Sequence, residues 1–130
     1  MPNGTGTVLV PSPMPVDFPP PIKVPGGRER VFVNPPVIHI GHGHSQLRDI
    51  QFTNHTGGTV RLWFPNGALL FTAPPDGYPN FENPFVIERN QKLDLKLKSG
   101  CEYSSYYYHV YCDVIGNEAE GNSPPVLNCP

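Results

Sequence analysis

Short stretches in which apolar and polar residues alternate recur along the chain from residue 30 onward. The clearest is KLDLKLK at 92–98, where the leucines fall on one side of an extended chain and the charged residues fall on the other. Alternation with a period of two residues predicts half-buried β-strands. The predicted strands are 30–33, 37–40, 48–54, 59–64, 84–88, 92–98, 103–112 and 125–129.

The segments between these stretches are rich in glycine, proline, asparagine and aspartate, which are the residues that form turns. Seven to eight short strands separated by such turns predict an all-β domain, built as a sandwich or a barrel. The one stretch with the composition of a helical turn is NGALLFT at 66–72.

The first part of the chain has a different composition, because ten of the 18 prolines lie within the first 36 residues. Proline has no backbone N–H to donate, so we expect residues 1–29 to be a proline-rich extension or edge segment that lies over the surface or acts as a linker. The apolar patches at 8–10 and 22–24 are candidates for edge strands, where proline is tolerated. The folded domain is expected over residues 30–130.

Size and charge narrow the class of protein. A chain of 130 residues fits one domain, and a charged fraction of 15% with a net charge of -2 gives no basic surface for nucleic acid. No apolar run approaches the length of about 18 residues that a membrane span needs. The N-terminus lacks the basic and continuous apolar regions of a secretory signal, so no signal peptide is expected within this chain.

From about residue 30 to 129 the order of these segments resembles the cupredoxins, the family of plastocyanin and azurin. The most specific part is the motif Y-x-V-x-C, carried here by Tyr108, Val110 and Cys112, with SGCEY before it and a final strand after it. The resemblance implies a Greek-key β-sandwich of two sheets. It also implies that the metal-binding end is formed by the loop after Cys112 and by the strand at 59–64.

A type 1 copper site of that family uses two histidines, a cysteine and a weak axial methionine, because thiolate and imidazole together suit copper. The matching positions in this chain are Val60, Cys112, Ile115 and approximately Glu120, so that Cys112 alone retains its ligand. The resemblance therefore implies a degenerate copper site. Cys112 is expected to be a small buried residue, and no cofactor is expected. A shifted loop would instead bring Glu118 or Glu120 near the thiol and give a site for zinc or another divalent ion.

Histidines elsewhere in the chain provide a second hypothesis for a metal site. The segment HIGHGH places His39, His42 and His44 close together, and His55 follows in the next turn. In an extended chain, residues two apart point the same way about 7 Å apart along the backbone, which suits a surface site for Cu(II), Ni(II) or Zn(II). The competing interpretation is a solvated loop flanked by glycine. One of these histidines could also join Cys112 in binding copper. This is the alternative to a degenerate site that binds no metal.

The aromatic run YSSYYYHVY at 103–111 separates by parity into two sets. Tyr106 and Tyr108 fall on the inward side, and His109 is expected outside as a cross-strand packing partner. The outward set predicts an exposed patch of the kind that binds partners or carbohydrates. Its members are Trp63, Tyr103, Tyr107 and Tyr111. The competing interpretation is that the proline-rich arm packs over this patch.

The remaining two cysteines suggest a disulfide. If the hairpin between 103–112 and 125–129 turns near residue 118, Cys101 and Cys129 come opposite one another. A disulfide implies an oxidising compartment, so we expect an extracytoplasmic location, periplasmic or secreted. This pairing leaves the third cysteine of the chain as a free thiol.

The sequence contains no G-x-S-x-G, no H-E-x-x-H and no phosphate-binding glycine loop. We therefore expect a non-enzymatic binding or structural module, whose partner is an unidentified protein or small molecule. Two alternatives stay open, a copper-binding or electron-transfer protein and an accessory domain of an enzyme.

Overall fold

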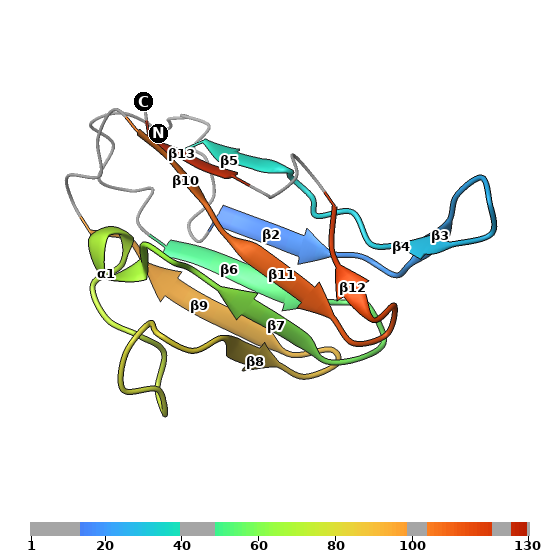
Figure 1. Ribbon diagram of the computed structural model, residues 1–130. Coiled ribbons are helices and arrows are strands. Elements are labelled where there is room, and N and C mark those ends of the chain that lie inside the picture. Colours follow the sequence, from blue (N-terminus) through green and yellow to red (C-terminus); the bar gives the residue numbers. More distant parts are fainter. Residues whose placement is uncertain (1–13, 40–48, 99–103, 121–125, 130) are drawn as a thin grey trace, which may run out of the picture.

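The computed structural model describes residues 14–39, 49–98, 104–120 and 126–129 (Figure 1). These ranges contain twelve strands, several only two residues long, and one short helix inside the stretch predicted to hold a helical turn. Within the same ranges no helix is long and apolar enough to cross a membrane. The elements are β2 (Met14–Phe18), β3 (Ile22–Lys23), β4 (Glu29–Arg30), β5 (Val37–His39), β6 (Asp49–Asn54), β7 (Val60–Trp63), α1 (Gly67–Leu70), β8 (Phe85–Ile87), β9 (Lys92–Lys96), β10 (Ser104–Tyr107), β11 (His109–Cys112), β12 (Asn117–Glu118) and β13 (Val126–Cys129).

The strands form layers around one hydrophobic core. A sheet with the order β12-β11-β7-β8 faces a second sheet with the order β2-β6-β9. A third sheet has the order β10-β13-β5, and β3 pairs with β4 in a hairpin. Figure 1 shows α1 at one end of the molecule and the β3–β4 hairpin, next to β12, at the other. The all-β sandwich expected from the alternating pattern is confirmed.

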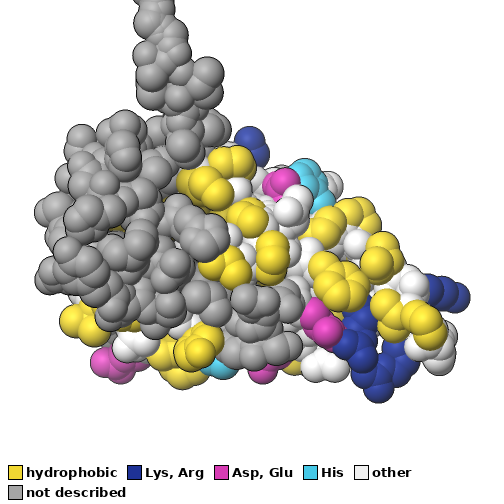
Figure 2. Space-filling model, turned by 90° about the horizontal axis from the view of Figure 1, so that it is seen from above, with side chains coloured by type: hydrophobic (Ala, Val, Ile, Leu, Met, Phe, Trp, Pro, Cys, Tyr) yellow, Lys and Arg dark blue, Asp and Glu magenta, His cyan; other side chains and the backbone are white. Residues whose placement is uncertain are grey.

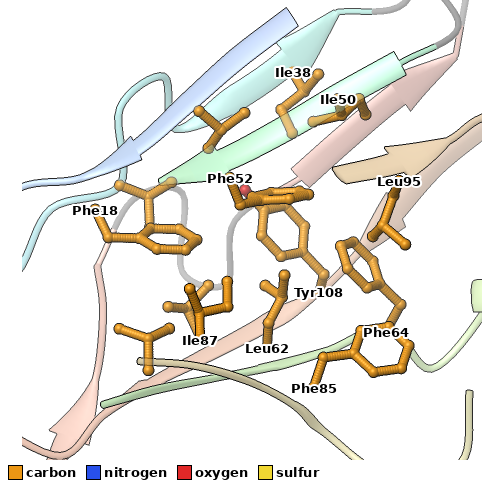
Figure 3. Close-up of a cluster of buried hydrophobic side chains, with 14 of the residues drawn as sticks. Phe18, Ile38, Ile50, Phe52, Leu62, Phe64, Phe85, Ile87, Leu95 and Tyr108 are labelled. Atoms are coloured by element: carbon orange, nitrogen blue, oxygen red, sulfur yellow. The ribbon is translucent and has the colours of Figure 1, made fainter. Parts of the chain in front are cut away.

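Aromatic side chains from both layers meet at the centre of the core (Figure 3). The ring centroid of Phe52 in β6 lies 5.8 Å from that of Phe64 and 6.0 Å from that of Tyr108. The rings of Phe64 and Tyr108 stack with centroids 5.1 Å apart, and all three residues are buried. Burying a large apolar side chain stabilises a fold by about 1.5–3 kcal/mol. These contacts therefore hold the two sheets together.

The long strand expected at 103–112 is divided at Tyr108. β10 pairs with β13 in one sheet, whereas β11 pairs with β7 and β12 in another. Burial nevertheless alternates through the break, since Tyr108 and Cys112 are completely buried while Tyr107 and Tyr111 are exposed. The inward row of side chains therefore continues from one sheet into the next, and its predicted parity is correct.

The proline-rich segment contributes more to the core than its composition suggests. Residues 14–18, within the part expected to be an extension or edge segment, form β2, which pairs in parallel with β6 at the edge of its sheet. Val16 and Phe18 are completely buried, and the rings of Phe18 and Phe52 stack with centroids 5.9 Å apart. This inward pair anchors β2 although Pro15 has no N–H to donate, a lack that an edge strand tolerates.

The predicted strand that begins at Arg30 is only partly regular. β4 ends at this residue, and Phe32 forms an isolated bridge with Glu120. The chain changes its partner within a few residues, so no continuous ladder of hydrogen bonds is built. β3 lies within the edge patch predicted at 22–24, and the patch at 8–10 lies outside the described residues.

Candidate functional site

β7 and β11 are antiparallel neighbours in the four-stranded sheet, and their register brings Cys112 opposite Val60. Opposed residues in such a pair have Cβ atoms about 4.5–5.5 Å apart. Both side chains are completely buried. The neighbour of the thiol on this side is therefore an aliphatic side chain without a metal-binding atom, at the position where the resemblance places a histidine.

After Cys112 the chain makes a tight turn. The backbone N–H groups of Ile115 and Gly116 donate to the carbonyl of Cys112 at 3.2 and 2.9 Å, and β12 then pairs back on β11. Gly116 has a φ of 62°, a left-handed conformation that glycine adopts without strain. Ile115 is partly buried and packs against the core. An apolar side chain thus fills the position that the resemblance assigns to the second histidine.

Glu120, near the position of the axial ligand, contacts the segment 30–33, which begins with the last residue of β4. Its carboxylate forms an ion pair with the guanidinium of Arg30. Its backbone N–H donates to the carbonyl of Val31 at 2.7 Å, and its own carbonyl accepts from the N–H of Val33 at 2.8 Å. Both the side chain and the backbone of Glu120 therefore have partners in this segment.

The turn before β7 packs directly on the turn after β11. A Cβ atom on Gly58 would lie 3.2 Å from the Cβ of Val114, so a larger residue would have to push Val114 away. Beside this contact, the N–H of Asp113 donates to the carbonyl of Thr59 at 3.0 Å. The end of the β7–β11 pair is therefore closed by backbone contacts.

A buried asparagine fixes the turn before β7. The side-chain NH2 group of Asn54 donates to the carbonyls of Gly58 and Ile87 at 2.7 and 2.8 Å. Its side-chain oxygen accepts from the backbone N–H and the hydroxyl of Thr56 at 3.0 and 2.7 Å. Because both donors and the acceptor of the amide are used, Asn54 ties β6, the turn and β8 together and sets where β7 begins.

Burial raises the pKa of the Cys112 thiol to about 12, and the charge of Asp113 adds to the effect. The thiolate is the form that binds metals and acts as a nucleophile. At neutral pH Cys112 is therefore a protonated, nearly apolar group. Its surroundings suit packing better than ligation or covalent catalysis.

The histidines considered as recruited ligands belong to separate elements. His55 is exposed in the turn between β6 and β7, where its N–H donates to the carbonyl of Phe18 at 2.8 Å. His39 is the last residue of β5, whose neighbour is β13. His42 and His44 lie outside the described residues. In the ranges that the structure describes, no three His, Cys, Asp or Glu side chains are placed to hold a metal ion.

The outward sides of β7, β8 and β11, with the end of β10, form a surface that we call the aromatic face. Its residues are Arg61, Trp63, Val86, Tyr107, His109 and Tyr111. Trp63, Tyr107 and Tyr111 are 37%, 56% and 40% exposed. Trp63 stands opposite His109, and their rings stack with centroids 5.4 Å apart. Tyr103, also predicted for this surface, lies outside the described residues.

Charged groups lie between the aromatic rings of this face. Arg61, opposite Tyr111, forms a two-point ion pair with Asp113 at N–O distances of 3.2 and 3.3 Å. This hydrogen-bonded carboxylate raises the pKa of Arg61 above its ordinary value. Nδ1 of His109 lies 3.3 Å from Oε1 of Glu118. Parity along one strand predicts the tyrosines, but it does not place Arg61 or Glu118 beside them, because that depends on the register between strands.

The pairing of β10 with β13 has a different register from that expected for the disulfide. Ser104, rather than Cys101, stands opposite Cys129. The expected register assumes a plain hairpin, whereas β11, β12 and the break at Tyr108 lie between the two strands. Cys101 lies outside the described residues, so its disulfide with Cys129 stays a prediction.

Comparisons with known proteins give only distant similarity, to solved structures. Neither the protein-family models nor the curated proteins give a match to this sequence. Among solved structures, the chain is similar to one described as "Multicopper Oxidase mgLAC (data2)", with 18% identity and a TM-score of 0.48. The alignment covers 88% of this chain and 37% of that one. A similarity of this size assigns no family, and the architecture described above rests on the strands themselves.

Proposed function

We propose that this protein is a non-enzymatic binding module with a cupredoxin-like fold and without a type 1 copper site. The observation that carries the proposal is the complete burial of Cys112 directly opposite Val60. A type 1 site needs imidazole nitrogens beside the thiolate. The sheet neighbours of Cys112 are Val60 on one side and Asn117 on the other. The raised pKa of the thiol also acts against ligation.

The surface proposed to bind is the aromatic face. Three exposed aromatic rings in and beside one sheet form an apolar patch of the kind that marks interaction sites. Aromatic side chains provide a large contact area at a low cost in conformational entropy. The ion pair of Arg61 with Asp113 supplies polar groups at the border of the patch. An aromatic centre with a polar border is the usual arrangement of a binding surface.

A copper titration tests the first half of the proposal. Purified protein is freed of metal and titrated with Cu(II), while the visible absorption of a copper–thiolate bond and the copper bound per chain are measured. We expect no copper–thiolate absorption, and the same weak binding in wild type and in Cys112→Ser. Stoichiometric copper that is bound by wild type and lost in Cys112→Ser would overturn the proposal and support an electron-transfer or copper-carrying role.

The second half is tested through the intrinsic fluorescence of Trp63, the one tryptophan in the chain. A library of soluble oligosaccharides and peptides is screened for compounds that shift its emission. We expect Tyr111→Ala to weaken the binding of such compounds, and Lys92→Ala, an exposed change in the other sheet, to leave it unchanged. Compounds that bind equally well to Tyr111→Ala would place the binding surface elsewhere.

A further inference from the structure

The end of the molecule that carries the β3–β4 hairpin has a different chemical character from the aromatic face. A cavity of about 640 Å3 lies between this hairpin and the β11–β12 turn. Lys23, Arg28 and Arg30 line it from the hairpin, and Val114 and Ile115 line it from the turn. Figure 2 shows Lys and Arg side chains gathered at this end of the molecule. The cavity therefore has a basic wall on the hairpin side, and on the turn side an apolar wall formed by Val114 and Ile115 beside the polar Asn117.

The turn of the hairpin positions the basic wall. The N–H of Val24 donates to the carbonyl of Arg28, and the N–H of Gly27 donates to the carbonyl of Val24, both at 3.0 Å. Gly26 and Gly27 have φ values of 100° and 81°, which other residues rarely adopt. This reversal brings residues from the two arms of the hairpin to the same cavity.

The cavity is positively charged although the chain as a whole is not. Its lining holds three cations and one carboxylate, Glu29, whereas the net charge of the protein is -2. Lys23 stands opposite Glu29, and Arg30 is held by its ion pair with Glu120. Arg28 has no ion pair with any of the described residues. Nε of Arg30 is buried and has no hydrogen-bond partner among the described residues. The basic wall thus has hydrogen-bond donors, above all those of Arg28, that are not paired with a carboxylate of the described residues.

We infer that this cavity binds a small amphipathic anion. Its carboxylate or sulfonate group is bound by Arg28 and Lys23, and its apolar body lies against Val114 and Ile115. Hydrogen bonds from a guanidinium group to such anions are charge-assisted and are stronger than hydrogen bonds between neutral groups. Val114 is 43% exposed, so its side chain is accessible to a ligand. Cavities of roughly 300–1,000 Å3 are typical of small-molecule sites. The site uses none of the residues of the aromatic face.

Three probes test the charge and the apolar body separately. Octanoate, octylammonium and inorganic phosphate are each titrated into the full-length protein, and backbone amide shifts are followed by NMR. We expect octanoate to shift the resonances of residues 23–30 and 113–117 saturably, and octylammonium to leave them unchanged. Phosphate should bind at least about tenfold more weakly than octanoate, because it has no methylene groups to bury.

Variants test whether the named cations are responsible. Lys23→Ala combined with Arg28→Ala should weaken octanoate binding by about tenfold or more. Lys98→Ala, which removes a lysine that donates to the carbonyl of Ala68 in α1, is the matched control and should bind as wild type. Trp63→Ala should also bind octanoate as wild type, which separates this site from the aromatic face.

Several results would overturn the inference. Equal binding of octanoate and octylammonium would show that charge does not select the ligand, and phosphate binding as tightly as octanoate would remove the role of the apolar wall. Unchanged binding in the double variant would exclude Lys23 and Arg28. None of these results bears on copper or on the aromatic face, so the proposed function is tested independently.

Discussion

Tyr111 and Cys112 are consecutive residues of β11 that face opposite environments. Cys112 is completely buried opposite Val60, whereas Tyr111 is 40% exposed beside Arg61. Inward side chains of this strand pack in the hydrophobic core, while among the described residues the outward side chain of Tyr111 lies between Arg61 of β7 and Glu118 of β12. The inward row therefore determines the stability of the fold, and the outward row is free to serve recognition. Val60 and Ile115 belong to the inward packing, Val60 completely buried and Ile115 partly buried against the core.

The largest expected effect compares two tyrosines on opposite sides of the same segment. Tyr108→Ala should lower the free energy of unfolding by about 3–5 kcal/mol, because it leaves a cavity between Phe52 and Phe64. Tyr111→Ala should change it by no more than about 0.5 kcal/mol, as is usual for exposed positions. Chemical denaturation followed by circular dichroism measures both. Equal losses in the two variants would contradict the conclusion that the inward row stabilises the fold more than the outward row does.

A somewhat smaller loss is expected from Asn54→Ala. The change removes the side-chain partner of the Ile87 carbonyl and of the Thr56 N–H, and it leaves the Gly58 carbonyl with only the Thr56 hydroxyl as a donor. Each buried polar group that loses its partner costs about 1–3 kcal/mol, so the free energy of unfolding should fall by at least about 2 kcal/mol. Asn117→Ala removes an exposed asparagine and is the control. A similar stability for the two variants would mean that the buried amide does not fix the turn.

A third effect appears only at alkaline pH. The pKa of Cys112 rises from 9.0 in its reference state to about 12 in the fold, so the folded protein holds this proton more tightly than the unfolded chain. The resulting stabilisation is fully present below about pH 9 and is lost as the pH rises towards 12. Unfolding measured between pH 8 and 11 should therefore show a shallower decline in Cys112→Ala than in wild type. Parallel curves would contradict the buried, protonated thiol.

Burial also raises the pKa of Tyr108 above its reference value of 10.0, and its hydroxyl has no hydrogen-bond partner among the described residues. Its titration adds to the alkaline loss of stability, but it begins at a higher pH than that of the thiol. Tyr108→Phe in the Cys112→Ala background separates the two contributions. The difference between the variants should be greatest above about pH 10.

The smallest effect concerns the stacked pair on the aromatic face. A double-mutant cycle with Trp63→Ala and His109→Ala should give a coupling energy of about 0.5–1 kcal/mol, as for other cross-strand aromatic pairs. Thermal or chemical unfolding of the wild type and the three variants measures it. A coupling of zero would show that the two rings do not stack in solution.

The sequence predicts which side chains of a strand are buried, but it does not predict which strands pair. Alternation in 103–112 correctly places Tyr108 and Cys112 inside and Tyr111 outside, because a period of two is a local property of an extended strand. The break at Tyr108 is not predictable in this way, since it depends on which strands lie beside β10 and β11. The register error at Cys129 has the same cause.

Two further features are hidden for physical reasons. The burial of Val16 and Phe18 is one of them. The prolines around β2 are visible in the sequence and argue against a strand, whereas the burial of these two side chains depends on how the whole chain folds. The basic cavity joins residues 23–30 with 114–117, which no local pattern connects. For the candidate metal site, the resemblance places Val60 and Cys112 at corresponding ligand positions, and the structure brings them opposite each other.

The break at Tyr108 has a consequence for how the protein unfolds. β10 and β11 are consecutive, so one short segment supplies a strand to two different sheets. Neither sheet can release that segment without depriving the other of a partner. A partly folded form, with one sheet intact and the other unfolded, therefore keeps few stabilising contacts. We expect a single cooperative transition with no populated intermediate, in which secondary structure and aromatic packing are lost together.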